Sequence, residues 1–168
     1  MTDPLQPTLV IGLGNPLMTD DGVGIVALER LRAGWALGSD VTLVDGGTWG
    51  MNLLPMIEDA RRLVLIDAIR AGGAPGTLVT LERDQLPRYF SHKLSPHQID
   101  LKEVLALAEL RGTLPPEIVA IGLEPADAEH MGTELTAVVA GRVDDLVGAV
   151  AARLRAMGHE CLPLTPTI

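Results

Sequence analysis

The sequence predicts an α/β fold: a mainly parallel, doubly wound sheet with helices on both faces, in a single domain. Short apolar runs rich in β-branched residues recur along the chain, and stretches with helical spacing lie between most of them. A length of 168 residues is that of one ordinary domain, which can bury a core without disulfides or a structural metal. Ligands bind such a sheet beyond the carboxyl ends of its strands, so functional residues are expected there.

Five apolar runs are predicted to be short buried strands. They are residues 8–11, 41–44, 63–66, 78–81 and 118–121. The clearest helical pattern spans residues 135–154, where apolar side chains recur at three- and four-residue steps, and Gly158 is placed to end that helix. The domain covers residues 1–168 with a core of about 8–160, and the first few residues and the tail after Glu160 are expected to be loose.

The first predicted strand runs into a glycine-rich loop, Gly12-Leu-Gly-Asn-Pro16. Gly12 and Gly14 permit a tight turn and a close backbone approach. A dinucleotide-binding loop begins in the same way, but it needs a third glycine at position 17, where this chain has Leu17. Dinucleotide binding is therefore not favoured.

Two adjacent carboxylates, Asp20 and Asp21, follow this loop and precede a stretch with apolar residues along one helical side. Asp21 is a candidate metal ligand. The alternative is that Thr19 or Asp20 caps the helix, while Asp21 merely favours its positive end.

Asp67 ends the apolar run at 63–66, where a charge needs a partner to offset its desolvation. Its alternative role is that of a loop-facing Asp that accepts backbone hydrogen bonds. His97 lies in Ser95-Pro-His-Gln98, which has the form of a helix start with the serine as N-cap and the proline at the first helical position. The helix dipole disfavours imidazolium there, so the ring is expected to be neutral and available to a metal; the alternative is a solvent-facing histidine.

A doubly wound sheet would bring Asp21, Asp67 and His97 to one edge, because each follows a strand or opens a helix. Two carboxylates and one imidazole suit a divalent ion such as nickel or zinc, and they leave coordination positions for substrate or water. We expect all three at an exposed edge rather than in the core.

Composition excludes several other classes of protein. The net charge of −9, from 13 basic and 22 acidic residues, opposes binding to nucleic acid. The only cysteine, Cys161, cannot close an intramolecular disulfide, which favours a cytoplasmic protein. No apolar stretch reaches membrane-spanning length, so no membrane association is expected. The chain also has no Gly-x-Ser-x-Gly element for serine chemistry.

Five segments resemble the hydrogenase maturation endopeptidases in residue type and order. They are residues 12–24, Asp45-Gly-Gly-Thr48, residues 65–68, residues 75–77 and Ser95-Pro-His-Gln98, within a similarity that covers about residues 8–160. The resemblance implies that Asp21, Asp67 and His97 form the metal-binding and catalytic site, although some members carry Glu in the first loop. It also implies that Gly46, Gly47 and Thr48, in a turn after the second strand, shape the substrate cleft. The alternative there is a strand-exit turn whose glycines take positive φ.

The resemblance further implies a cytoplasmic, nickel-dependent endopeptidase that removes the C-terminal extension of the nickel-loaded large-subunit precursor of a nickel-iron hydrogenase. Nickel would be presented by the precursor, and a carboxylate beside it could also activate water. One alternative is a peptidyl-tRNA hydrolase-like esterase, which shares Gly-Leu-Gly-Asn-Pro but then needs Thr-Arg-His-Asn where this chain has Met18-Thr-Asp-Asp. The other is a chaperone that binds nickel or the precursor without cutting.

Overall fold

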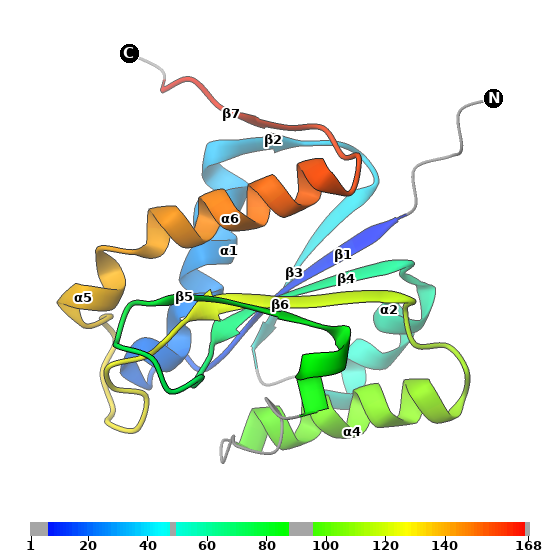
Figure 1. Ribbon diagram of the computed structural model, residues 1–168, viewed down its shortest axis with the longest axis horizontal. Helices are drawn as coiled ribbons and strands as arrows, with labels where there is room; N and C mark the ends of the chain where they lie inside the picture. The colour runs from blue at the N-terminus through cyan, green and yellow to red at the C-terminus, as the bar shows by residue number, and fades with distance from the viewer. Residues whose placement is uncertain (1–6, 48–49, 88–95, 167–168) are drawn as a thin grey trace.

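The computed structural model describes residues 7–47, 50–87 and 96–166, with the backbone alone at 50, 96–100 and 102. Its centre is a five-stranded sheet of order β3-β1-β4-β6-β5 (Figure 1). The strands are β1 (Thr8–Leu13), β3 (Val41–Gly47), β4 (Arg62–Ala68), β5 (Leu78–Glu82) and β6 (Glu117–Leu123). All neighbours pair in parallel except β5, which is antiparallel to β6. The mainly parallel sheet and the five predicted strands are confirmed.

Helices cover both faces of the sheet, as predicted. The first face carries α1 (Val23–Gly34) and α6 (Val143–Ala156), and the other carries α2 (Leu54–Asp59) and α4 (Pro96–Leu110) (Figure 1). The remaining helical elements are α5 (Ala137–Ala140) and the 3-10 turns η1 (Thr19–Gly22), η2 (Gly50–Leu53) and η3 (Arg83–Gln85). In the described ranges no helix has the length and apolar character needed to cross a membrane.

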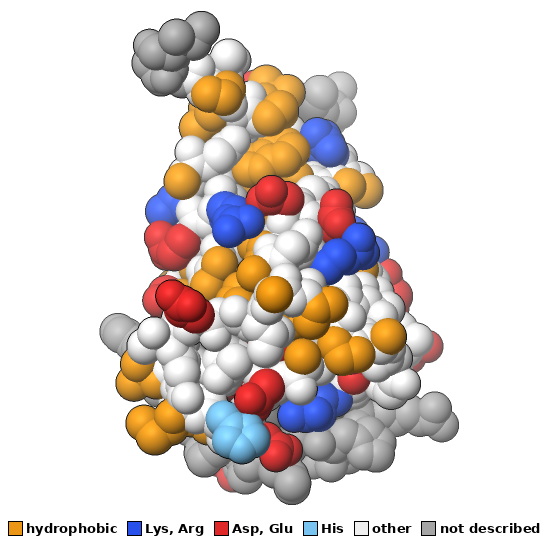
Figure 2. Space-filling model, turned by 90° about the vertical axis from the view of Figure 1, so that its left-hand side faces the viewer, with side chains coloured by type: hydrophobic (Ala, Val, Ile, Leu, Met, Phe, Trp, Pro, Cys, Tyr) orange, Lys and Arg blue, Asp and Glu red, His pale blue; other side chains and the backbone are white. Residues whose placement is uncertain are grey.

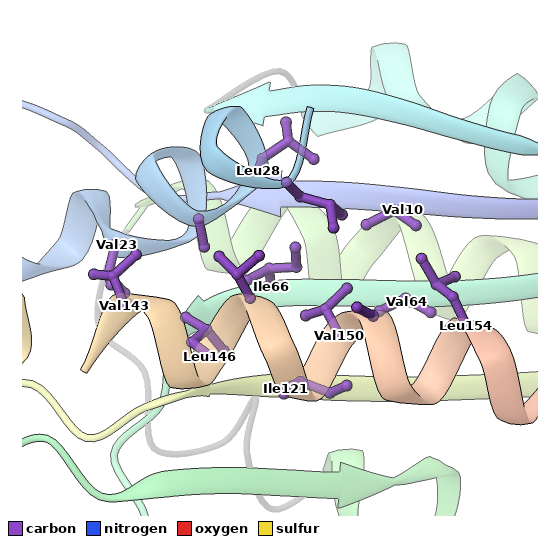
Figure 3. Close-up of a cluster of buried hydrophobic side chains, with 14 of the residues drawn as sticks. Val10, Val23, Leu28, Val64, Ile66, Ile121, Val143, Leu146, Val150 and Leu154 are labelled. Atoms are coloured by element: carbon purple, nitrogen blue, oxygen red, sulfur yellow. The ribbon is translucent and has the colours of Figure 1, made fainter. Parts of the chain in front are cut away.

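The core lies in two layers because side chains alternate across the strands. Val10, Val64 and Ile66 face α1 and α6, where they meet Leu146, Val150 and Leu154 (Figure 3). Ile11 and Leu65 face the opposite way and pack toward α2 and α4. Because the strands are packed on both faces, the positions of their carboxyl ends are fixed. The candidate metal ligands Asp21 and Asp67 lie at this edge of the sheet.

The long helix predicted over 135–154 is in fact two helices. Residues 141 and 142 separate α5 from α6, and the Arg142 side chain donates from Nε to the carbonyl oxygen of Gly76 at 3.1 Å. Glycine at 141 weakens the helix at the point where this tertiary contact anchors the chain. The predicted stop is confirmed: Gly158 has φ +92, and its amide bonds back to the carbonyl of Arg155.

The C-terminal tail is more ordered than expected. Residues after Glu160 form β7 (Cys161–Pro163), which pairs antiparallel with β2 (Trp35–Leu37) in a second small sheet. The pairing buries Cys161, and burial raises the pKa of its thiol. A thiol held protonated in this way does not suit nucleophilic chemistry.

The segment Asp45-Gly-Gly was predicted to be a turn, but it is still part of β3. The register shifts there, so that Gly12 pairs with Asp45 and Leu13 pairs with Gly47. The extra residue forms a bulge in which Gly46 presses against Ile11: an added Cβ would lie 2.4 Å from its Cγ2. Gly47 alone of the two glycines takes a positive φ, +43.

Candidate active site

Asp21 and Asp67 both lie close to Gly14, at the carboxyl ends of β1 and β4. A Cβ at Gly14 would lie 1.8 Å from the carbonyl oxygen of Asp21 and 3.7 Å from Oδ1 of Asp67. Gly14 also has φ +118, a conformation that L side chains rarely adopt. The absence of a side chain at Gly14 therefore leaves room for the Asp21 backbone and the Asp67 carboxylate to approach the loop.

Backbone amides orient both carboxylates. The amide of Asn15 donates to Oδ2 of Asp21 at 2.9 Å, and the amide of Ala68 donates to Oδ1 of Asp67 at 2.8 Å. Asp67 is fully buried and Asp21 is 5% exposed, so the expectation of an exposed edge is wrong for these two residues. The turn η1, which carries Asp21, packs against β4, which carries Asp67, so these residues lie against other parts of the chain rather than at an open edge.

His97 lies in the first turn of α4, which begins at Pro96 as predicted. The start of α4 points to the same side of the molecule as the carboxyl ends of β1, β4 and β6, and α4 packs on η2, directly after β3 (Figure 1). The side chain of His97 and the predicted cap Ser95 lie outside the described part of the chain. Among the side chains that are described, no three His, Cys, Asp or Glu are placed to hold a metal ion. The three-residue metal site therefore stays a prediction.

The predicted substrate cleft is described only in part. Gly46 and Gly47 lie at the carboxyl end of β3, beside β1 and hence beside the loop that carries Asp21. Thr48 lies outside the described residues. The role of these three residues in binding substrate also stays a prediction.

Asp20 is not a helix cap, nor is Thr19. The N-cap of α1 is Gly22, which makes no side-chain cap hydrogen bond. The Asp20 side chain is fully buried and accepts hydrogen bonds from a loop more than 100 residues away. Its donors are the amides of Ala126 (2.9 Å), Asp127 (2.9 Å) and Thr136 (2.8 Å) and the Thr136 hydroxyl (2.8 Å). An Asp before a helix gives no sign of so distant a partner, so the sequence could not reveal this role.

The loop at 124–136 lies against the first loop along several backbone contacts. The Thr19 amide donates to the carbonyl of Gly132 at 3.0 Å, and the Thr19 hydroxyl donates to the carbonyl of His130 at 2.7 Å. The Gly132 amide in turn donates to the carbonyl of Leu17 at 2.9 Å. The two loops therefore form one rim beside Asp21.

The rim carries the half-buried Asp127 and the exposed His130, whose carboxylate and ring Nδ1 lie 3.0 Å apart. Hydrogen bonds from the amides of Glu129 and His130, and then from the His130 ring, lower the pKa of Asp127. Figure 2 shows this end of the molecule, where acidic side chains and a basic one lie beside a histidine. Neither residue is among the site residues predicted from the sequence.

Fold and site together define an α/β protein with the buried acidic residues Asp21 and Asp67 at the carboxyl edge of a mainly parallel sheet. The family of hydrogenase maturation proteases matches residues 25–153 of this chain. The chain is 40% identical over 156 residues to the hydrogenase expression/formation protein HupD of Rhodobacter capsulatus, which covers 92% of this chain and 74% of that protein. It is 36% identical over 157 residues to the hydrogenase 2 maturation protease of Escherichia coli strain K12, covering 92% and 94%.

The fold also matches a solved structure, the hydrogenase maturating endopeptidase HybD from E. coli. The TM-score is 0.88 at 34% identity, covering 94% of this chain and 97% of that chain. This chain therefore belongs to the hydrogenase maturation protease family, and it is a hydrolase of the endopeptidase class.

Proposed function

We propose that this protein removes the C-terminal extension of the nickel-loaded large-subunit precursor of a nickel-iron hydrogenase, and that it recognises the nickel through Asp21, Asp67 and His97. The observation that carries the proposal is that the backbone of Asp21 and the carboxylate of Asp67 both lie against Gly14 at the carboxyl edge of the sheet. Family membership supports the reaction, and the carboxylates support the metal.

The donor set fits a divalent ion that belongs to the substrate. Asp21 and Asp67 supply oxygen ligands whose orientation is fixed by the amides of Asn15 and Ala68. With the imidazole of His97 they would make three protein ligands, and the remaining positions would go to groups of the precursor. An ion that needs both partners binds fully only in the complex, which gives the protease a way to reject a precursor without nickel.

The hydrolysis needs a water molecule beside the scissile peptide. The attacking water loses a proton as its oxygen bonds to the peptide carbonyl carbon, and the leaving amine gains one. We assign the proton acceptor to one of the two carboxylates, since no serine or cysteine elbow competes for the role. A cytoplasmic location follows from the proposed substrate and agrees with the single, buried and unpaired Cys161.

The test is to incubate the metal-free protease with precursor made with and without nickel and to weigh the products by mass spectrometry. We expect cleavage of the nickel-loaded precursor, and an uncut nickel-free precursor even with protease in excess. A protease that needs loading with zinc or nickel, and that then cuts nickel-free precursor, would overturn the proposal. Nickel-dependent binding without cleavage would instead identify a chaperone.

A further inference from the structure

We infer that Asp20 is a positioning residue for Asp21: its buried carboxylate ties the turn that carries Asp21 to the 124–136 loop. The inference rests on the proposed function only for the task of Asp21, which is there assigned to nickel. The hydrogen bonds that connect Asp20 to the 124–136 loop do not depend on that assignment.

The two adjacent carboxylates have different hydrogen-bond partners. Asp20 faces the 124–136 loop, where four donors from Ala126, Asp127 and Thr136 satisfy both of its oxygens. The Asp21 carboxylate instead accepts from the amide of Asn15, in the loop that follows β1. Because the two residues share one short turn, the bonds of the first fix the orientation of the second.

The turn that carries Asp20 and Asp21 has a strained backbone at Thr19. Thr19 has φ +54, a left-handed conformation that is unfavourable for a β-branched residue. Hydrogen bonds to the neighbouring loop offset this strain. Thr19 donates to the carbonyls of Gly132 and His130, and the Asp20 amide donates to the carbonyl of Asp127 at 2.8 Å. Strain of this kind persists only where neighbouring structure imposes it, and it is concentrated at functional sites.

Burying the Asp20 carboxylate costs free energy unless hydrogen bonds replace those it makes with water. A fully buried carboxylate is stable only when its hydrogen bonds are satisfied. The four donors come from a loop, and none of them is a free amide of α1. The bonds therefore serve the relative position of turn and loop rather than the start of the helix.

The direct test measures amide hydrogen exchange at Asn15, whose N–H reports whether the Asp21 carboxylate is in place. Two folded variants weaken the tie: Asp20→Asn keeps the size but turns an amide N–H toward backbone donors, and Thr136→Val removes only the hydroxyl donor. We expect Asn15 to exchange at least about tenfold faster in both variants, while the amides of β1 and β4 keep their protection. Unchanged exchange at Asn15 in folded Asp20→Asn and Thr136→Val would overturn the inference.

Two matched variants on the same loop separate positioning from general damage. Thr136→Ser retains the hydroxyl and should restore the protection of Asn15. Asp127→Asn changes a carboxylate that bonds to Glu129 and His130 rather than to Asp20, so it should leave Asn15 as in the wild type. Faster exchange at Asn15 in Asp127→Asn would show that any disturbance of the loop reaches Asp21, and it would overturn a specific role for Asp20.

The functional readout compares the affinity for nickel-loaded and nickel-free precursor. A merely structural role would lower both affinities together, whereas a displaced Asp21 lowers the preference for the nickel-loaded form in Asp20→Asn by about tenfold. If the wild type has no such preference, the proposed function fails, and exchange at Asn15 still decides the role of Asp20. If the wild type has it and folded Asp20→Asn keeps it, the positioning role fails alone.

Discussion

At the residue scale, backbone amides from the adjoining chain help to orient Asp21 and Asp67. Each amide belongs to the segment that carries the glycine-rich loop or the end of β4, so the carboxylates are fixed by the local chain path. A ligand held in this way needs little reorganisation when a metal arrives. The same burial that fixes them makes their substitution a test of both function and stability.

We predict that Asp67→Asn abolishes processing while the protein stays folded. The new side chain keeps an oxygen for the Ala68 amide, but it loses the negative charge that would hold nickel or accept a proton. The cleavage rate should fall by at least about 100-fold, as should that of Asp21→Asn and His97→Ala. Cleavage is measured by mass spectrometry and folding by circular dichroism, with the exposed Asp84→Asn as control. Folded variants that process at the wild-type rate would refute the site.

A second residue-scale prediction concerns His159, which is buried at the opposite end of the sheet. Its Nε2 lies 2.6 Å from the Thr8 hydroxyl, and its Nδ1 has no hydrogen-bond partner within the described part of the chain. Burial lowers the pKa of His159 below its ordinary 6.5, the Arg62 cation lowers it further, and Asp40 opposes the shift.

A pKa that is lower in the folded state means that the unfolded state binds the proton first. The stability contributed by neutral His159 is therefore present above pH 6.5 and is lost as the pH falls through the native pKa. Denaturant unfolding from about pH 7.5 to about pH 5 should show a steeper loss in the wild type than in His159→Gln. Equal losses in the two proteins would contradict this account.

At the element scale, local patterns predicted what local physics determines. The five strands were found because aliphatic runs buried on both faces leave a clear signal. The break at 141–142 was missed because the apolar period continues across it, and the break depends on the contact of Arg142 with Gly76. Strand β7 was missed because it has three residues, and its pairing with β2 is visible only in three dimensions.

Two glycines in helices give a prediction at this scale. In α1, a Cβ on Gly24 would lie 2.2 Å from the carbonyl oxygen of Ile66 and 2.4 Å from that of Leu13. Gly24→Ala should therefore push α1 off the sheet and lower the free energy of unfolding by about 3 kcal/mol or more. The control is Gly148→Ala in α6, where a Cβ meets nothing within 4 Å.

Gly148→Ala should raise the free energy of unfolding by about 0.5–1 kcal/mol, because alanine favours the helix and restricts the unfolded chain. Both free energies of unfolding are to be measured by urea denaturation of the purified variants. A Gly24→Ala variant as stable as Gly148→Ala would show that α1 can shift from the sheet without cost, against the close packing described above.

At the scale of the whole molecule, the candidate site is assembled from segments far apart in the chain. The loop at 14–22, the end of β4 and the 124–136 loop meet at one end of the sheet, toward which α4 also begins. The predicted parallel sheet alone places Asp21 and Asp67 at this edge, since Asp67 lies at the end of one strand and Asp21 lies beyond the loop that follows another. Their burial and the tie through Asp20 depend on the path of loops, which a single sequence leaves undetermined.

We predict that nickel and precursor, as two ligands of this protein, strengthen each other's binding. If the ion completes its coordination only with groups from both chains, nickel must raise the affinity for precursor by the same factor by which precursor raises the affinity for nickel. Three protein ligands leave the other positions to water, so the isolated protein should bind nickel weakly. Titration calorimetry should give a coupling factor of about 5 to 150 in both directions, the usual range for linked sites.

Asp21→Asn should reduce that factor toward one in both directions, because it removes a nickel ligand without touching the rest of the interface. Asp84→Asn should leave it unchanged, since Asp84 is exposed in η3, which follows the antiparallel strand β5 and so lies at the opposite edge from the carboxyl ends of β1 and β4. An isolated protein that already binds nickel as tightly as the complex does would contradict this account. Its nickel would then be a resident cofactor, and discrimination between loaded and unloaded precursor would need a different physical basis.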